Sequence, residues 1–273
     1  MVTFPNAKIN IGLDIVSRRE DGYHNIESIM VPVPWRDILE IVPAQGDEST
    51  LTITGREVNC PIEKNLVMKA FRAMQQNYSV PNADIYLHKV IPDGAGLGGG
   101  SADAAFTIIA VNELFSLNAS KEDLAKIAAT IGADCPFFIY NTPMLATGIG
   151  TEFSDVELDL SGYKILIVKP HVSVPTAQAY AGVTPQLPEK SLKELITTPH
   201  CQWQGVIKND FEKSIFPLHP IVADIKQQII DMGAIYASMS GSGSAVYGIF
   251  KNDILSEVKL SIFEQYDMFV GDL

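Results

Sequence analysis

The amino-acid sequence predicts an α+β fold in two domains. Segments with strand periodicity and segments with helix periodicity are mixed along the chain, without the regular alternation that a doubly wound sheet requires. The chain has 273 residues, of which 47% are hydrophobic, so it is long enough for two modest domains with their own cores. The pattern is interrupted near residues 145–160, where glycines and then acidic residues follow one another. We therefore expect one domain over residues 1–150 and a second over residues 151–273.

The charge balance argues against several classes of partner. The chain carries 32 acidic residues against 20 Lys and Arg, a net charge of −12. Nucleic acids and anionic membranes are bound by basic surfaces, so neither is an expected partner. No apolar run approaches the roughly 18–20 residues of a membrane span, and the first residues lack a signal-peptide pattern. We expect a cytoplasmic protein that is a monomer or a weak homodimer.

The cysteines and histidines do not form a metal-binding or disulfide pattern. Cys60, Cys135 and Cys201 are odd in number and far apart, and no CxxC pair is present. The five histidines show no HExxH spacing. We therefore expect reduced cysteines and no tightly bound metal.

The chain begins with a predicted hairpin. Apolar residues occupy every second position over residues 7–15, which predicts a half-buried strand whose other face carries Lys8 and Asn10. Asp21 and Gly22 supply a turn, after which a strand over about residues 23–33 pairs back.

The remaining elements follow from apolar spacing and from cap residues. Helical spacing predicts helices over residues 63–77, 102–115, 120–132 and 220–232. Alternating or branched residues predict strands over residues 38–42, 51–54, 84–91 and 163–168, and a strand pair within 234–250. Ser120 is predicted to cap one helix and Gly132 to end it, and a short helix is expected to start with Thr176 as its cap. Residues 186–199 are polar and proline-flanked, which predicts a surface excursion.

The most informative segment is the glycine-rich run over residues 92–101, between a predicted strand and a predicted helix. Five of the seven residues from Gly94 to Gly100 are glycine. Glycine lets the backbone approach an anion closely, and the start of a helix adds N–H donors and a partial positive charge. The run therefore predicts a phosphate-binding loop. The alternative is a flexible linker, but linkers do not lead straight into a buried helix.

Other phosphate-binding patterns fit this segment less well. The chain has no GxxxxGK[ST] and none of the protein-kinase motifs VAIK, HRD and DFG. Residues 94–99 match GxGxxG, but a second capped helix follows instead of a strand that ends in an acidic residue. A dinucleotide-dependent oxidoreductase is therefore a weaker alternative.

Three further features have two interpretations each. Residues 239–244 form a second glycine cluster, which is either a hairpin turn or a support for the phosphate loop. Lys8 is either a solvated lysine or part of a cleft wall together with Asn10. Asp134 follows a helix end in GADCPFF, where it either caps a nearby loop or acts as a general base.

The order of these motifs resembles the GHMP small-molecule kinases. Residues 5–10, 92–105 and 239–250 look like the three motifs of that family. The segments AKIN, RREDGYHNIES, GLGGGSADAA, GADCPFF and VSVPTAQAY are most similar to its branch of 4-diphosphocytidyl-2-C-methyl-D-erythritol kinases, which serve non-mevalonate isoprenoid biosynthesis. The resemblance spans about residues 5–250, nearly the whole chain.

The resemblance implies the fold and the chemistry. It implies a ribosomal-S5-like N-terminal half, a ferredoxin-like C-terminal half, and an active site between them. It implies phosphorylation of the C2 hydroxyl, with ATP as co-substrate and Mg²⁺ carried by ATP. Lys8 and Asp134 would be the catalytic pair. The residues expected to bind ATP are Pro92, Asp93, Gly94, Ala95, Gly96, Leu97, Gly98, Gly99, Gly100, Ser101 and Ala102. The residues expected to bind the cytidylyl substrate are Asn10, Tyr23, His24, Thr176 and Tyr180.

Two positions depart from the family pattern. The family usually has Ser-Ser after the triple glycine, whereas this chain has Ser101 and Ala102. The family also commonly has an acid where Thr151 stands. The missing hydroxyl supports an alternative in which the chain is an inactive nucleotide-binding module, although both Lys8 and Asp134 are retained. Another GHMP small-molecule kinase is the second alternative.

Overall fold

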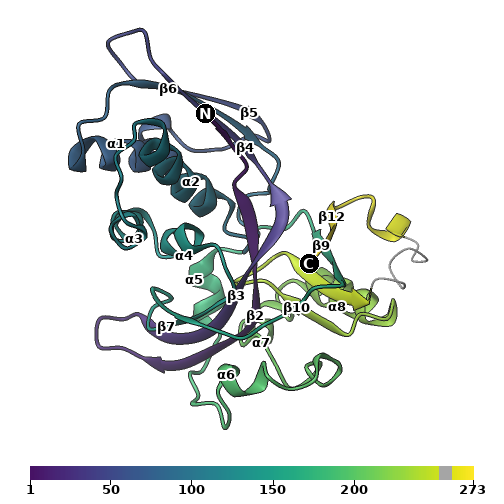
Figure 1. Ribbon diagram of the computed structural model, residues 1–273. Coiled ribbons are helices and arrows are strands. Elements are labelled where there is room, and N and C mark those ends of the chain that lie inside the picture. Colours follow the sequence, from purple (N-terminus) through teal and green to yellow (C-terminus); the bar gives the residue numbers. More distant parts are fainter. Residues whose placement is uncertain (252–259) are drawn as a thin grey trace. The chain divides into compact units, whose positions relative to one another are not determined.

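The computed structural model describes residues 1–251 and 260–273, which form an α+β fold, as predicted (Figure 1). Its internal contacts divide the chain into two compact units. Unit 1 comprises Met1–Ala7, Trp35–Asp93 and Gly98–Thr142, and unit 2 comprises Lys8–Pro34, Gly94–Leu97 and Pro143–Leu273. Each unit consists of three separate segments of the chain, so the two units do not correspond to the expected domains over residues 1–150 and 151–273. That domain division remains a prediction.

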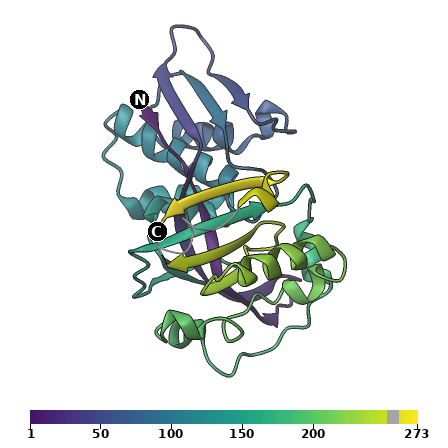
Figure 2. The same cartoon turned by 90° about the vertical axis from the view of Figure 1, so that its right-hand side faces the viewer.

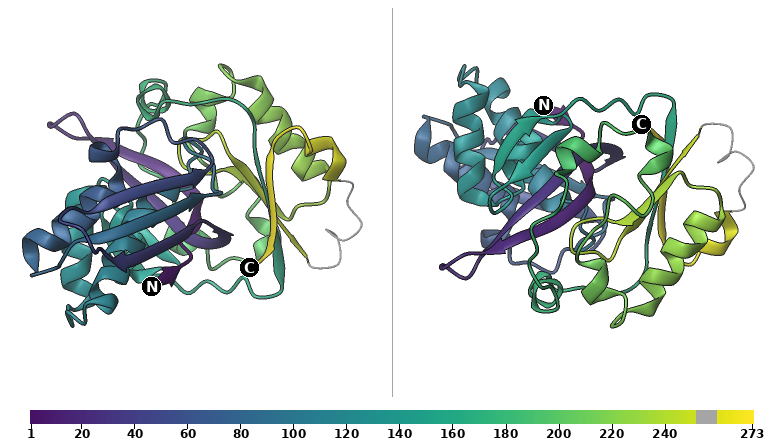
Figure 3. Two further views of the ribbon diagram at one scale, coloured as in Figure 1. Left: turned by 90° about the horizontal axis from the view of Figure 1, so that it is seen from above. Right: turned by 90° about the horizontal axis from the view of Figure 1, so that it is seen from below.

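Unit 1 is built on a four-stranded sheet with the order β1-β4-β6-β5. Its strands are β1 (Val2–Thr3), β4 (Ile38–Pro43), β6 (Ala83–Lys89) and β5 (Thr50–Gly55). The β5–β6 pair is parallel and the other pairs are antiparallel. Its helices are η1 (Ile62–Lys64), α1 (Leu66–Asn77), α2 (Gly99–Leu114), α3 (Lys121–Ile131) and α4 (Cys135–Tyr140). Figure 3 shows the longer of these helices gathered on one side of the sheet.

The helix ends of unit 1 follow from local side chains. The Ser120 hydroxyl accepts a hydrogen bond from the backbone N–H of Asp123, so the predicted N-cap of α3 is confirmed. Helix α3 ends at Ile131 with Gly132 as its C-cap, so the predicted end of the helix is confirmed, and the backbone of Gly132 is extended at φ −175° rather than left-handed. The physical reason is that Cys135 donates its backbone N–H to the Gly132 carbonyl and the chain passes directly into α4. Sequence periodicity does not reveal this six-residue helix.

Unit 2 contains two four-stranded sheets among the described residues. The first has the order β2-β3-β7-β8 and comprises β2 (Asn6–Arg18), β3 (His24–Arg36), β7 (Met144–Thr147) and β8 (Glu152–Asp155). The end residues Asn6, Ala7, Trp35 and Arg36 of its long strands belong to unit 1. The second sheet is antiparallel, has the order β10-β11-β9-β12, and comprises β10 (Tyr236–Met239), β11 (Val246–Lys251), β9 (Tyr163–Lys169) and β12 (Asp267–Asp272).

The helices of unit 2 complete its core. They are α5 (Thr176–Ala181), α6 (Leu192–Leu195), η2 (His200–Gln202), α7 (Glu212–Ile215), α8 (Pro220–Asp231) and η3 (Leu260–Phe263). Figure 2 shows α8 against one face of the second sheet. Val222, Ile225 and Ile229 of α8 join the buried cluster there, as their helical spacing requires. No helix of the described residues is long and apolar enough to cross a membrane.

Two expectations about unit 2 are corrected by its packing. Pro175, not Thr176, is the residue before α5, and Thr176 is its first helical residue, without a capping role. The segment over residues 186–199 is not wholly a surface excursion, because it contains α6, and its Leu192 and Ile196 are buried. Leu192 packs on Gly12 so closely that a Cβ there would lie 2.6 Å from Leu192 Cδ2.

Candidate active site

The glycine-rich segment leads from β6 into α2 with a left-handed backbone at alternate residues. Gly94, Gly96 and Gly98 have φ angles of +62°, +74° and +71°. L-residues rarely adopt such angles, so the spacing of the glycines follows from the path of the chain. Gly98 is the N-cap of α2 and provides no side-chain capping bond. No side chain therefore caps the first N–H groups of α2, an arrangement that suits a phosphate.

The second glycine cluster supports the first one within unit 2. Residues 240–245 form the turn between β10 and β11, and the Ser240 hydroxyl donates a 2.8 Å hydrogen bond to the Gly96 carbonyl. The Ala245 N–H donates to the Ala95 carbonyl at 3.1 Å. A Cβ on Gly96 would lie 2.0 Å from the Ser240 carbonyl oxygen. The segment is thus both a hairpin turn and a support for the loop.

Lys8 and Asn10 are buried, at 3% and 2% exposure, so Lys8 is not a solvated surface lysine. The Lys8 backbone N–H donates to the Leu97 carbonyl at 2.8 Å, which places β2 directly beside the glycine-rich segment. The Lys8 ammonium donates to Asn10 Oδ1 at 2.5 Å. Unit 2 therefore brings together Lys8, Asn10 and part of the predicted ATP loop.

Asp134 lies in unit 1, at the residue before α4, and is half-buried. Its carboxylate accepts no capping hydrogen bond from the backbone of α4, so Asp134 does not act as a side-chain cap of that helix. Lys8 belongs to unit 2 and Asp134 to unit 1. The pairing of the two as catalytic residues therefore stays a prediction.

The residues after the triple glycine lie in the first turns of α2. The Ser101 hydroxyl hydrogen-bonds the Cys135 thiol, and burial raises the pKa of that thiol to about 11. Cys135 is therefore an uncharged thiol at neutral pH rather than a nucleophile. Ala102, where the family usually has a second serine, is fully buried in unit 1. The hydroxyl that this chain lacks would therefore lie at a buried position.

A buried ion cluster in unit 1 joins the two ends of the loop, and sequence analysis missed it. The Lys89 ammonium at the end of β6 donates to Asp37 Oδ2 at 2.5 Å and to Asp103 Oδ2, in α2, at 2.7 Å. Asp37 Oδ1 also accepts the backbone N–H groups of Val90 and Ile91. Burial raises the pKa of the Asp103 carboxyl above its ordinary value. The only signal in the sequence is a lysine at the end of an apolar strand, which does not reveal its partners.

An aromatic cavity of about 580 Å³ lies in unit 2 at the turn after β2. It is lined by Arg18, Gly22, Tyr23, His24, Ile149, Ala177, Tyr180, Ala181, Val183 and Pro185. The His24 and Tyr180 rings stack with centroids 5.0 Å apart, and the Tyr180 ring meets the Phe211 ring edge-on at 4.8 Å. Tyr23 is 63% exposed, so it is not packed on its hairpin partner. The volume and the ring faces suit a small ligand with a planar group.

Three of the five predicted substrate residues line this cavity, namely Tyr23, His24 and Tyr180. Asn10 and Thr176 do not line it. Thr176 Oγ1 instead lies 3.4 Å from the hydroxyl of Ser242 in the second glycine cluster. Arg18 and Ile149 are lining residues that sequence analysis missed. Ile149 is distant in sequence from the hairpin turn, and only the β2-β3-β7-β8 sheet brings its segment to the cavity.

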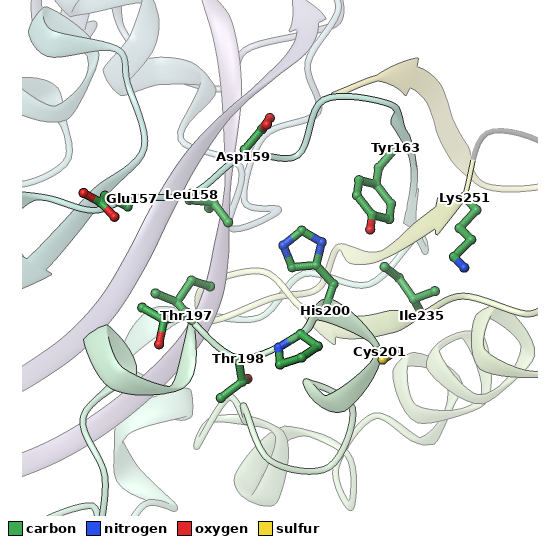
Figure 4. A pocket seen from close by; sticks show the side chains of 12 residues that line it. Glu157, Leu158, Asp159, Tyr163, Thr197, Thr198, His200, Cys201, Ile235 and Lys251 are labelled. Carbon is green, nitrogen blue, oxygen red and sulfur yellow. The ribbon is translucent and has the colours of Figure 1, made fainter.

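Figure 4 shows another hollow of unit 2, about 660 Å³ in volume. The His200 ring lies there between Tyr163 and Trp203, with centroid distances of 5.1 and 4.5 Å. Burial lowers the pKa of His200. None of the residues expected to bind ATP or substrate lines this hollow.

The sequence matches two models of one kinase family. The model described as GHMP kinases N terminal domain matches residues 65–142, and the one described as GHMP kinases C terminal matches residues 185–267. These two models together cover more than half of the chain, which supports the phosphate-binding interpretation of the glycine-rich segment and the two-domain α+β fold.

Proteins of similar sequence and structure identify the branch of this kinase family. The chain is 54% identical over 251 residues to the 4-diphosphocytidyl-2-C-methyl-D-erythritol kinase of Parabacteroides distasonis and 49% identical over 253 residues to that of Bacteroides thetaiotaomicron, with 92% of each chain covered. A solved 4-(cytidine 5'-diphospho)-2C-methyl-D-erythritol kinase superposes with a TM-score of 0.81 at 29% identity, covering 99% of this chain and 98% of that one. The chain is therefore an ATP-dependent small-molecule kinase and belongs to the 4-diphosphocytidyl-2-C-methyl-D-erythritol kinase family of the GHMP kinases.

Proposed function

We propose that this chain transfers the γ-phosphoryl group of ATP to the C2 hydroxyl of 4-diphosphocytidyl-2-C-methyl-D-erythritol, in non-mevalonate isoprenoid biosynthesis. The observation that carries the proposal is the aromatic cavity of Tyr23, His24 and Tyr180, in a chain whose glycine-rich segment has the backbone of a phosphate loop. A planar base needs ring faces, and a triphosphate needs backbone N–H groups. The relatives named above act, by their names, on this cytidylyl compound.

The proposed roles follow from the chemistry of phosphoryl transfer. The transition state is loose, so catalysis consists mostly of positioning and charge stabilisation. Asp134 accepts the proton of the C2 hydroxyl late in the transfer. Lys8 keeps Asp134 ionised and stabilises charge that moves to the transferred group. The backbone of the loop holds the β- and γ-phosphates.

A magnesium ion would be delivered by ATP rather than held by a protein cage. Among the described residues, no three His, Cys, Asp or Glu side chains gather in a way that could hold a metal ion. Mg²⁺ commonly binds through one or two protein oxygens plus substrate phosphates, and Ser101 provides the one side-chain hydroxyl at the start of α2 in this proposal. Bound there, the ion would neutralise charge on the phosphates. The cytoplasmic location and the monomeric or weakly dimeric state also remain predictions.

The proposal is tested by ADP release in a coupled assay. We expect ADP to form with 4-diphosphocytidyl-2-C-methyl-D-erythritol and not with mevalonate or homoserine. A folded protein that releases no ADP with the cytidylyl compound would support the inactive nucleotide-binding module. Turnover of mevalonate or homoserine instead would indicate another GHMP kinase.

The substitution Tyr23→Ala tests the base site. Tyr23 is at the mouth of the aromatic cavity, and stacking of a base on an aromatic ring contributes about 1–3 kcal/mol. We therefore expect KM for the cytidylyl substrate to rise by about 5- to 150-fold, and KM for ATP to change little.

The uridine analogue provides the second measurement of the base site. A site that hydrogen-bonds the amine of cytosine should reject a base that lacks it, so the unsubstituted protein should use the analogue poorly. If Tyr23→Ala leaves KM for the cytidylyl substrate unchanged and the analogue works equally well, the base is bound elsewhere.

The substitution Gly98→Val tests the phosphate loop. At φ +71°, a β-branched residue is strained and its side chain stands where a phosphate would approach the start of α2. A hydrogen bond to a charged group contributes about 1.5–3 kcal/mol, so losing one should raise the Kd of ATP by about 10- to 150-fold. Isothermal calorimetry measures this Kd.

Gly162→Val is the matched control for the loop substitution. Gly162 also has a positive φ, +84°, and a Cβ there has no heavy atom within 4 Å. It carries the same backbone strain at a site without a role in ATP binding. Gly162→Val should bind ATP like the unsubstituted protein, and an equally unchanged Kd for folded Gly98→Val would contradict the phosphate-loop assignment.

A further inference from the structure

A chain of buried polar groups in unit 2 ends at the Lys8 ammonium. Lys8 Nζ donates to Asn10 Oδ1 at 2.5 Å, Asn10 Nδ2 donates to Ser28 Oγ at 2.8 Å, and Ser28 Oγ donates to the Gly12 carbonyl at 2.7 Å. Lys8, Asn10 and Ser28 are 3%, 2% and 0% exposed. Buried polar groups are costly unless each has a partner, so this chain holds its members in one arrangement.

The direction of every hydrogen bond in this chain is determined by its two ends. The Gly12 carbonyl can only accept, so the single hydroxyl proton of Ser28 must point at it. The Ser28 oxygen can then only accept from its other neighbour, which requires the NH₂ group of Asn10 on that side. The amide oxygen of Asn10 must consequently face Lys8, and the Lys8 ammonium can only donate.

Without Ser28, the NH₂ group of Asn10 loses its buried acceptor, and only the Lys8 ammonium still holds the amide in this orientation. Asn side chains can rotate their oxygen and nitrogen into each other's places, and the two orientations differ only in hydrogen bonding. The rotated amide would present its NH₂ donors to an ammonium group that is also a donor, which displaces the lysine. The backbone of Asn10 is held separately, because its carbonyl accepts the Tyr247 hydroxyl at 2.7 Å. Ser28 therefore controls the side-chain amide and Tyr247 the backbone.

We propose that Ser28 is a positioning residue for phosphoryl transfer, which orients the Asn10 amide so that its oxygen holds the Lys8 ammonium in place. The proposal rests on the catalytic role of Lys8 given above. Ser28 does not contact substrate in this scheme. It lies on β3, 20 residues along the chain from Lys8, and acts only through Asn10.

The first measurement compares Ser28→Ala with a matched serine. Misplacing a catalytic group by about 1 Å can cost about 10²-fold, so Ser28→Ala should lower kcat by about 10- to 100-fold and leave KM for ATP nearly unchanged. Ser238→Ala is the control, since Ser238 is 1% exposed in the same unit and its hydroxyl bonds Glu212. Equal kcat values for the two alanine variants would overturn the proposal.

The second measurement is a double-mutant cycle with Asn10→Asp. Both oxygens of an aspartate accept, so its rotation no longer matters to Lys8, and the single Ser28 proton can then serve either the carboxylate or the Gly12 carbonyl. If Ser28 acts by orienting the amide, Ser28→Ala should cause no further loss of kcat in the Asn10→Asp background. If Ser28 contributes only to packing, the two effects should multiply, and that result would contradict the proposal.

Lys8→Ala separates this proposal from the function on which it rests. Normal kcat in a folded Lys8→Ala variant would remove the catalytic role of Lys8, whatever Ser28 does. A large loss of kcat in Lys8→Ala together with multiplying effects in the cycle would leave the kinase mechanism standing and overturn only the role of Ser28.

Discussion

Asp134→Asn is expected to lower kcat by about 10²- to 10⁴-fold, the usual contribution of a general base. Asparagine has the shape of aspartate but neither accepts a proton at neutral pH nor carries the charge that Lys8 would balance. Substrate affinity should change much less, because a general base interacts more strongly with the transition state than with the bound substrate. Steady-state kinetics with each substrate varied in turn measure both effects.

Asp123→Asn provides the control for the change of charge. Asp123 is an exposed carboxylate of the same unit, at the start of α3, and its pKa is lowered by hydrogen bonds from Lys126 and Ser120. That variant should keep its kcat. A near-normal kcat for Asp134→Asn as well would exclude the general-base role and leave Asp134 with a role in the loop before α4.

Lys89→Met is expected to destabilise the protein by about 3–5 kcal/mol, the usual effect of removing one member of a buried ion cluster. Lys89, Asp37 and Asp103 are all at most 3% exposed, so the two carboxylates would face each other without their cation. Methionine has a similar volume, which makes the loss one of charge rather than packing. Denaturant unfolding at neutral pH measures the change as a lower midpoint.

Lys126→Met is the matched control for this measurement. Lys126 pairs with Asp123 at 2.8 Å, but their side chains are 76% and 52% exposed. Water screens such pairs, so the midpoint should hardly move. Equal midpoints for the two variants would show that the buried cluster contributes no more than a surface pair. Because Asp37 and Asp103 hold the two ends of the glycine-rich segment, a folded Lys89→Met protein should also bind ATP more weakly.

Local periodicity was sufficient to predict most elements, because strands and helices bury one face at a fixed spacing. The hairpin of β2 and β3, the buried helix α2 and the Ser120 cap are confirmed on that basis. Helix α4 was missed since six residues are too few to show a period, whereas the end of α3 at Gly132 is confirmed.

The sequence by itself determined the α+β class and the kinase family, and it predicts where the phosphate-binding loop lies, because these depend on residue type and order within short segments. Only the tertiary structure decided that Lys89 neutralises two distant aspartates, that His24 stacks on Tyr180, and that Ser28 orients Asn10. Each of these contacts joins residues from different elements. The partner of a buried polar group depends on which strands and helices pack together. The spacing of apolar residues in the sequence shows which face of an element is buried, but not which element covers it.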